Sequence, residues 1–186
     1  MTTGLRVLLI SGSLRAGSTN TALLRTAEAV CPHGIVATLY GDLGELPHFD
    51  PDLDGDLLPP AIVALRDAIH DCDAILFCTP EYAGALPGSF KNLLDWTIGD
   101  AEPGSIYEKP VAWVNASAAP TGAADAHESL QKVLRYAHAD VVKDACLPIP
   151  VLRQMIGDDG LIHDPAVRHE IQRALSALVA GSATAG

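Results

Sequence analysis

Apolar residues follow one another without interruption in some segments of this chain and recur every three or four residues in others. Continuous apolar runs, as at 5–10 and 74–79, are typical of strands buried on both faces of a parallel sheet. The spacing of Ile62, Leu65 and Ile69 predicts instead one apolar face of a helix. Because the two patterns alternate along the chain, the sequence predicts an α/β fold.

The same patterns predict five strands joined by helices. We expect strands at 5–10, 35–40, 74–79, 111–115 and 140–147. Helices are expected after Ser18 or Thr19, around Ile62, Leu65 and Ile69, after Pro87, at 122–138, and around Val167, Ile171, Leu175 and Leu178. A polar loop directly after the first strand favours a doubly wound sheet of flavodoxin-like order 2-1-3-4-5. We expect one domain over residues 1–186, with a flexible tail at about 181–186.

Composition narrows the classes of partner. The chain has 186 residues, of which 48% are hydrophobic, and a formal net charge of −11. This acidity argues against binding to nucleic acid or to anionic membranes, and no apolar run reaches membrane-spanning length. Six acidic residues and no Lys or Arg occur in residues 41–56, within a long loop at 41–59 that we interpret as solvated.

Cysteine and histidine usage gives no metal or disulfide motif. The four cysteines, at 31, 72, 78 and 146, form no Cys-x-x-Cys pair, and the seven histidines lack metal-ligand spacing. No secretory signal precedes the first strand. We therefore expect reduced structural cysteines, no metal and a cytoplasmic location.

Residues 12–20 read Gly-Ser-Leu-Arg-Ala-Gly-Ser-Thr-Asn and lie between the first strand and the first helix. Backbone amides at a helix N-terminus bind phosphate, and the side chains of Ser13, Ser18, Thr19 and Asn20 add neutral donors. Arg15 adds a guanidinium fork. The loop has neither the dinucleotide fingerprint nor a Walker pattern. It predicts a phosphate site, the alternative being a Ser/Thr-rich helix cap with a solvent-facing arginine.

A second candidate segment, 80–96, follows the third strand and begins Pro-Glu-Tyr-Ala-Gly-Ala-Leu-Pro-Gly. It offers an exposed aromatic, Tyr82, on a flexible backbone. In the expected strand order, this segment and the phosphate loop meet at the crevice where ligands bind. A phosphate site beside a flat aromatic loop suggests a phosphorylated, planar, aromatic ligand, and FMN fits that description best.

Both segments resemble one family. Residues 12–20 match the Gly-Ser-x-Arg-x-x-Ser-x-Asn pattern of the NAD(P)H-dependent FMN reductases, which include chromate, quinone and azo-dye reductases. Residues 80–96 resemble the same family's Pro-Glu-Tyr-Asn-x-x-x-Pro-Gly-x-x-Lys-Asn-x-x-Asp-Trp segment. The resemblance extends from residue 4 to about 140. It implies FMN as cofactor, NAD(P)H as electron donor, a small-molecule electron acceptor and a homodimer or homotetramer.

The resemblance also implies roles for individual residues. The FMN phosphate would be held by Ser13, Arg15, Ser18, Thr19 and Asn20. The isoalloxazine would be lined by Pro80, Glu81, Tyr82, Ala83 and Gly84, and by a third loop with Ser117, Thr121 and Gly122. No catalytic acid or base is expected, because the flavin carries the chemistry. The chain departs from the family pattern twice: Ala83 replaces an asparagine, and Gly122-Ala123 replaces a Gly-Gly pair.

Two other functions fit parts of the sequence. A flavodoxin-like electron carrier would share the acidic charge, but short flavodoxins have a Thr/Ser-Gly-x-Thr loop without arginine. A phosphate-binding regulator or hydrolase would need an acidic cluster or nucleophile after the first strand, where this chain has Ser11-Gly12-Ser13. The small residues 83–85 leave room for a nicotinamide beside the flavin, which favours the reductase.

Overall fold

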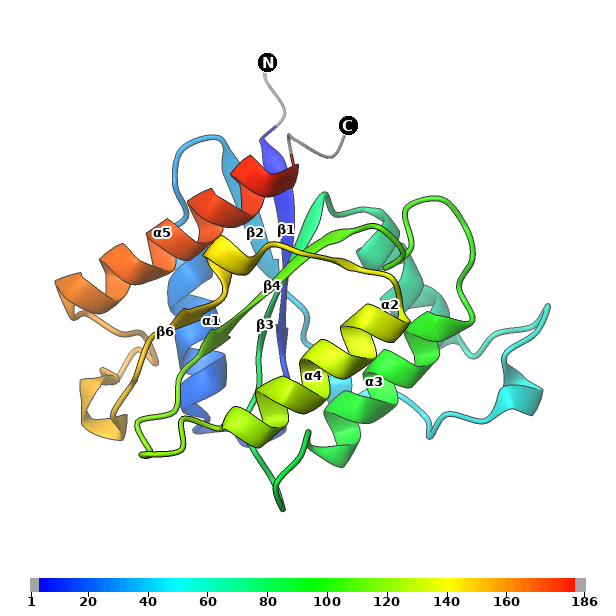
Figure 1. Ribbon diagram of the computed structural model, residues 1–186, viewed down its shortest axis with the longest axis horizontal. Helices are drawn as coiled ribbons and strands as arrows, with labels where there is room; N and C mark the ends of the chain where they lie inside the picture. The colour runs from blue at the N-terminus through cyan, green and yellow to red at the C-terminus, as the bar shows by residue number, and fades with distance from the viewer. Residues whose placement is uncertain (1–3, 183–186) are drawn as a thin grey trace.

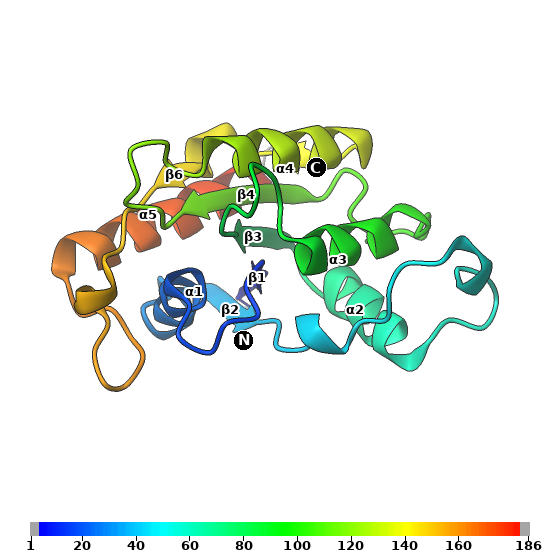
Figure 2. The same cartoon turned by 90° about the horizontal axis from the view of Figure 1, so that it is seen from below.

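A parallel β-sheet lies between two layers of helices in the computed structural model, which describes residues 4–182 (Figures 1 and 2). The four longer strands are β1 (Leu5–Ser11), β2 (Ile35–Leu39), β3 (Ala74–Cys78) and β4 (Pro110–Asn115). With the short strand β5 (Asp140–Val141), the sheet order is β2-β1-β3-β4-β5, and every pair is parallel. The predicted order 2-1-3-4-5 is therefore confirmed.

Helices cover both faces of this sheet. They are α1 (Thr19–Ala29), α2 (Pro60–His70), α3 (Gly88–Ile98), α4 (Ala124–Tyr136) and α5 (Pro165–Ser182). Buried side chains of α1 and α5 form one apolar cluster with the sheet, whereas those of α2, α3 and α4 form the other. The chain thus has the two-sided core that continuous apolar strands such as β3 predict.

The predicted strand at 140–147 is wrong as a single element. The chain forms β5 (Asp140–Val141), a 3₁₀ turn (Lys143–Ala145) and β6 (Leu147–Pro148), and both short strands pair with β4. The turn places Ala145 in the apolar cluster beneath α5. Pro148 is tolerated in this edge strand, because the amides of its neighbours continue the pairing: Ile149 donates to the Asn115 carbonyl at 2.8 Å, and Val151 donates to the Ala116 carbonyl at 3.0 Å.

Two predicted boundaries also differ from the structure. The helix expected at 122–138 is shorter, because Gly122 and Ala123 have positive φ angles of 59° and 53°. The tail expected at about 181–186 begins too early, since α5 continues to Ser182. The helix packs closely there: a Cβ atom on Gly181 would lie 2.8 Å from the methyl groups of Val142. Residues 183–186 lie outside the described part of the chain.

The long loop at 41–59 contains two 3₁₀ turns, Leu43–Glu45 and Pro51–Leu53, and is tied to α3. Asn92 accepts a hydrogen bond from the Phe49 amide at 2.7 Å. The side chains of Asn92 and Trp96 both donate to the Pro47 carbonyl at 2.9 Å. Asn92 and Trp96, from the Lys-Asn-x-x-Asp-Trp part of the second motif, therefore hold this loop. Because Trp96 is completely buried, its indole N–H needs the acceptor that the Pro47 carbonyl provides.

All four cysteines are free thiols, as the sequence predicts. Burial raises the pKa of Cys78 to about 12, so this thiol at the end of β3 stays protonated. Within residues 4–182, none of the helices is both long enough and apolar enough to span a lipid bilayer.

Candidate functional site

The loops after β1 and β3 touch one another where the two strands end. The Gly12 amide donates to the Cys78 carbonyl at 2.8 Å. A Cβ atom on Gly12 would lie 2.3 Å from the Thr79 hydroxyl oxygen, so only glycine permits this approach. The two polar segments singled out in the sequence therefore meet at the switch point of the sheet, as their strand positions predict.

The loop after β1 is organised by its own hydroxyl groups. The amide of Ser13 donates to the Ser11 hydroxyl, and the amide of Arg15 donates to the Ser13 hydroxyl, both at 3.3 Å. Ser18 is the N-cap of α1, and its hydroxyl accepts from the Thr21 amide at 3.4 Å. The loop thus ends at the N-terminus of α1, where backbone amides and the helix dipole attract an anion.

Asn20 completes this loop from the first turn of α1. It is 8% exposed, and its carbonyl oxygen accepts a hydrogen bond from the Cys78 thiol at 3.2 Å. This contact fixes the side chain between α1 and β3 and leaves its amide nitrogen as a donor beside the cavity described below.

The second loop forms a tight hairpin. Tyr82 and Ala85 exchange two backbone hydrogen bonds, at 3.0 and 3.1 Å, around Ala83 and Gly84. Both turn residues have positive φ angles, 52° and 69°, as a type I′ turn requires. Asn-Gly is the preferred sequence for that turn, which explains why the family pattern has asparagine where this chain has Ala83.

Glu81 connects this hairpin to α4. Its Oε2 accepts hydrogen bonds from the amides of Asp125 and Ala126, at 3.1 and 3.2 Å. The N-cap residue of α4, Ala123, provides no side-chain cap. A carboxylate from another loop therefore satisfies the first amides of α4 and lies favourably at the positive end of the helix dipole.

The third loop, after β4, is closed by Asn115. Its side-chain oxygen accepts from the Ser117 amide at 2.9 Å, and its amide nitrogen donates to the Gly122 carbonyl. Gly122 and Ala123 follow in left-handed conformations. The second departure from the family pattern is alanine in place of glycine at position 123. It thus also falls where the backbone has a conformation that glycine adopts more easily.

The three loops enclose a cavity of about 390 Å³. Ten of the predicted site residues line it: Ser13, Arg15, Ser18, Thr19, Asn20, Pro80, Glu81, Tyr82, Ser117 and Thr121. Three predicted residues, Ala83, Gly84 and Gly122, do not line it and instead form the turns beside it. The volume lies within the usual range of small-molecule sites.

Arg153 also lines this cavity, and the sequence did not indicate it. It belongs to a 3₁₀ turn, Arg153–Met155, far from both motifs in the chain. Its Nη1 donates to the Gly17 carbonyl at 3.0 Å. Arg153 and Ser18 also line a second, smaller cavity of about 200 Å³, which contains Arg25. Only the tertiary fold brings these cations to the loop, because no motif surrounds Arg153.

A donor-rich loop at a helix N-terminus, placed at the switch point of a parallel sheet of order β2-β1-β3-β4-β5, is the arrangement of a flavodoxin-like protein. Comparison with known proteins narrows this class. Residues 5–151 match the family described as NADPH-dependent FMN reductase. The chain belongs to that family, whose members are oxidoreductases that depend on FMN and NAD(P)H, as the two motifs predict.

Similar proteins cover nearly the whole chain. An NAD(P)H-dependent FMN reductase of Pseudomonas aeruginosa is 34% identical over 178 residues, which span 96% of this chain and 95% of that protein. A quinone reductase of Escherichia coli is 29% identical over 143 residues, 76% of each chain. Among solved structures, the flavoenzyme NAD(P)H:(acceptor) oxidoreductase FerB of Paracoccus denitrificans has a TM-score of 0.78 at 28% identity, covering 98% of this chain and 99% of that one.

Proposed function

We propose that this protein binds FMN in the 390 Å³ cavity and transfers electrons from NAD(P)H to a quinone or to another small acceptor, such as an azo compound, chromate or free flavin. The observation that carries the proposal is the shared cavity itself: one wall is the hydroxyl-rich loop at the start of α1, and another is the hairpin with the exposed Tyr82. A phosphorylated flat ligand suits this combination.

The residues present fit FMN. Arg15 and Arg153 supply positive charge in a strongly acidic chain, and hydroxyls of Ser13 and Ser18 lie on the same wall of the cavity. A phosphate at the α1 N-terminus would accept hydrogen bonds from these groups and from backbone amides. The loops around Tyr82 and Ser117 would contact the ring edges. No residue is needed as a catalytic acid or base.

FMN, when bound, supplies the chemistry: it accepts a hydride from a nicotinamide and passes electrons to the acceptor. The protein's part is to orient the reactants. Tyr82 is 48% exposed, and the turn beside it contains only small side chains. Such a wall leaves space for a second flat ring to stack. This feature favours a reductase over a carrier, and the free cysteines suit the reducing cytoplasm, where we propose that the protein acts.

Three measurements test this function. Denaturing the protein should release FMN. Apoprotein should bind FMN with a dissociation constant of about 1 μM or lower. Under anaerobic conditions, NADH or NADPH should bleach the bound flavin, and a quinone should restore its colour. Steady-state turnover should follow ping-pong kinetics. FAD in place of FMN would refute the cofactor assignment. Reduction by a partner reductase but by neither nicotinamide would establish the electron carrier instead.

A further inference from the structure

The smaller cavity, of about 200 Å³, shares Ser18 and Arg153 with the larger cavity that we assign to FMN. Its other walls come from the turn at Ala16 and Gly17, from the beginning of α1, and from residues 156–160. Figure 2 shows this last segment, in orange, beside α1. The cavity is therefore adjacent to the flavin site but separate from it, and the function proposed above does not use it.

Two guanidinium groups from distant parts of the chain border this cavity. Arg25 extends from α1, and its Nη1 lies 3.8 Å from the position that a Cβ atom on Gly160 would occupy. Arg153 comes from the turn after β6, and a Cβ atom on Gly17 would lie 3.1 Å from both of its Nη atoms. Each guanidinium carries five N–H donors in a planar fork, a shape that matches the oxygens of a phosphate.

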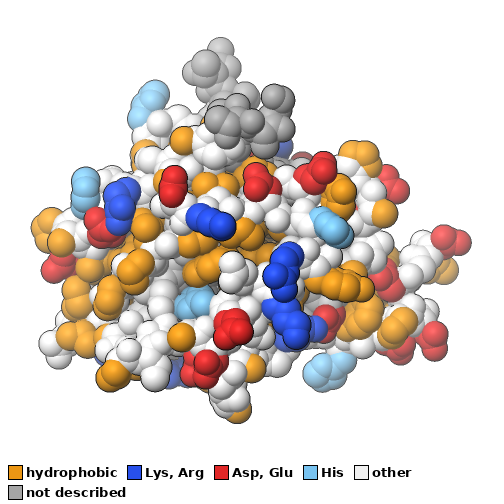
Figure 3. Space-filling model, in the orientation of Figure 1, with side chains coloured by type: hydrophobic (Ala, Val, Ile, Leu, Met, Phe, Trp, Pro, Cys, Tyr) orange, Lys and Arg blue, Asp and Glu red, His pale blue; other side chains and the backbone are white. Residues whose placement is uncertain are grey.

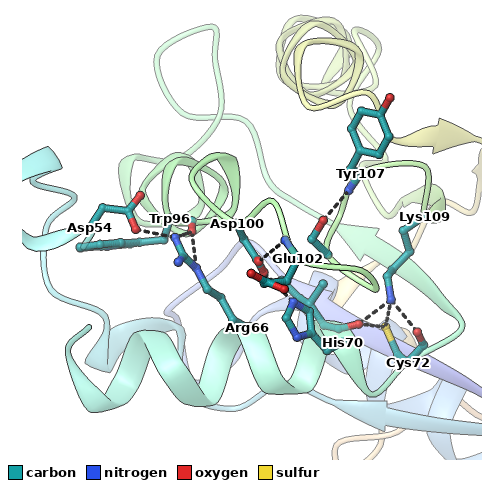
Figure 4. Close-up of polar contacts among 11 residues, drawn as sticks. Asp54, Arg66, His70, Cys72, Trp96, Asp100, Glu102, Tyr107 and Lys109 are labelled. Carbon is teal, nitrogen blue, oxygen red and sulfur yellow. Dashed lines mark hydrogen bonds and ion pairs between the residues drawn. The ribbon is translucent and has the colours of Figure 1, made fainter. Parts of the chain in front are cut away.

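Neither of these cations is neutralised by a carboxylate. Within residues 4–182, Arg25 forms no ion pair or hydrogen bond, and Arg153 donates only to the Gly17 carbonyl. No described Asp or Glu lines the cavity, although acidic side chains are spread over the whole face of the molecule in Figure 3. Arg66, in contrast, forms an ion pair of 2.8 Å with Asp54 (Figure 4). In a chain of net charge −11, two such cations beside one cavity indicate an anionic ligand.

The backbone adds neutral donors to the same walls. The amides of Ala16 and Gly17 donate to no acceptor in the described part of the chain. Both residues line the smaller cavity, and neither lines the larger one. Two amides beside two guanidinium groups offer more donors than the two oxygens of a carboxylate can use. The three oxygens and the double charge of a phosphate monoester suit this set of donors better.

We propose that the smaller cavity binds the 2′-phosphate of NADPH and that Arg25 distinguishes NADPH from NADH. This inference rests on the proposed function, because it requires the nicotinamide to lie at the flavin. NADPH carries its extra phosphate on the adenosine, far from the nicotinamide, so the site for that phosphate must be close to the FMN cavity but distinct from it. The wall that the two cavities share at Ser18 and Arg153 meets this requirement. An arginine is also the residue that accommodates this phosphate in dinucleotide-binding folds.

Calorimetric titration of the FMN-loaded full-length chain with NADP⁺ and NAD⁺ tests the site without electron transfer. The unmodified protein should bind NADP⁺ about tenfold or more tightly than NAD⁺, because NADP⁺ alone gains the charge-assisted contacts. Arg25→Ala should weaken NADP⁺ binding about tenfold and leave NAD⁺ binding and the FMN content unchanged. Arg25→Lys, which keeps the charge but loses the fork, should have an intermediate affinity for NADP⁺.

Arg6→Ala is the matched control for the change in net charge. Arg6 is also exposed, but it lies near the start of β1, at the end of the strand away from residues 12–20. Its replacement should change neither affinity, and circular dichroism verifies that each variant is folded. Equal affinities for NADP⁺ and NAD⁺ in the unmodified protein overturn the proposal, as does a preference for NADP⁺ that persists in Arg25→Ala.

Three small probes separate a site for the 2′-phosphate from a general anion site. Adenosine 2′-phosphate should displace NADP⁺ from the FMN-loaded protein, whereas adenosine 5′-phosphate and inorganic phosphate should each compete about tenfold less effectively or worse. Inorganic phosphate that competes as well as adenosine 2′-phosphate overturns the proposal, because the cavity would then bind any phosphate.

Steady-state kinetics separate failure of this inference from failure of the proposed function. Arg25→Ala should raise the KM for NADPH about tenfold without changing kcat or the KM for NADH, since the lost contact binds substrate and transition state alike. If both nicotinamides bleach the flavin with the same KM, the proposed function stands and the 2′-phosphate site is refuted. A protein that prefers NADP⁺ through Arg25 but is bleached by neither nicotinamide would refute the proposed function and still support the site.

Discussion

The guanidinium of Arg153 donates a hydrogen bond to the carbonyl oxygen of Gly17 at 3.0 Å, across 136 positions of the chain. The contact ties the segment after β6 to the loop at residues 12–20. Arg153 lies just beyond residues 5–151, which carry the family match. Arg153 lines the same cavity as Arg15, so the cavity beside residues 12–20 has two cations where the sequence of that loop shows one.

Replacing Arg153 with alanine should weaken FMN binding about ten- to a hundredfold, because a charge-assisted contact to phosphate contributes about 1.5–3 kcal/mol. Riboflavin, which lacks the phosphate, should lose much less affinity. Arg15→Ala should behave in the same way. Arg25→Ala is the control, since Arg25 lines only the smaller cavity. Flavin fluorescence titrations of the apoproteins measure all three, and equal losses for FMN and riboflavin would show that Arg153 does not contact the phosphate.

Removal of the Glu81 carboxylate should destabilise the junction between the second loop and α4. Glu81→Ala leaves the amides of Asp125 and Ala126 without their acceptor and should lower the free energy of unfolding by about 1–2 kcal/mol. Glu81→Gln retains one acceptor oxygen and should cost less. Glu128→Ala, on the exposed face of the same helix, should change little. Urea unfolding curves compare the variants, and an equal effect at 81 and 128 would refute the capping role.

Ala83→Asn should stabilise the protein. The residue has a φ of 52°, in the left-handed region that costs an alanine about 1 kcal/mol and that asparagine tolerates. The free energy of unfolding should therefore rise by roughly 0.5–1 kcal/mol. Ala85→Asn, just outside the turn, provides the comparison and should give no gain. A lower free energy of unfolding in Ala83→Asn would mean that side-chain contacts outweigh the backbone conformation at position 83.

Much of the fold was predictable because its signals are local. The uninterrupted apolar runs of β1 and β3 indicate buried parallel strands, and the loop at 12–20 carries its donors within nine residues. The division of segment 140–147 was not predictable, since it depends on the packing of Ala145 beneath α5. Similarly, nothing near Arg153 or Glu81 in sequence indicates the partners that the fold brings to them.

His127, on α4, should make the free energy of unfolding of this protein depend on pH. Its Nδ1 donates to the Ala123 carbonyl at 2.8 Å, and its ring stacks on Trp113 with centroids 6.2 Å apart. Its Nε2 is buried and has no hydrogen-bond partner among the described residues. Burial lowers the pKa of His127 below the ordinary 6.5, an effect that the Ala123 carbonyl only partly opposes.

The sign of the effect follows from linkage. In the unfolded chain this histidine becomes protonated as the pH falls through about 6.5, whereas in the folded protein it becomes protonated only at a lower pH. The stabilising contribution is therefore complete above about pH 6.5 and is lost as the pH falls toward the folded pKa. The free energy of unfolding should decrease between about pH 7.5 and 5.5. The decrease should be smaller in His127→Gln, which cannot be protonated. His33→Gln, at an exposed position, should show the same decrease in the free energy of unfolding as the unmodified protein. An equally large decrease in His127→Gln would show that other groups cause it.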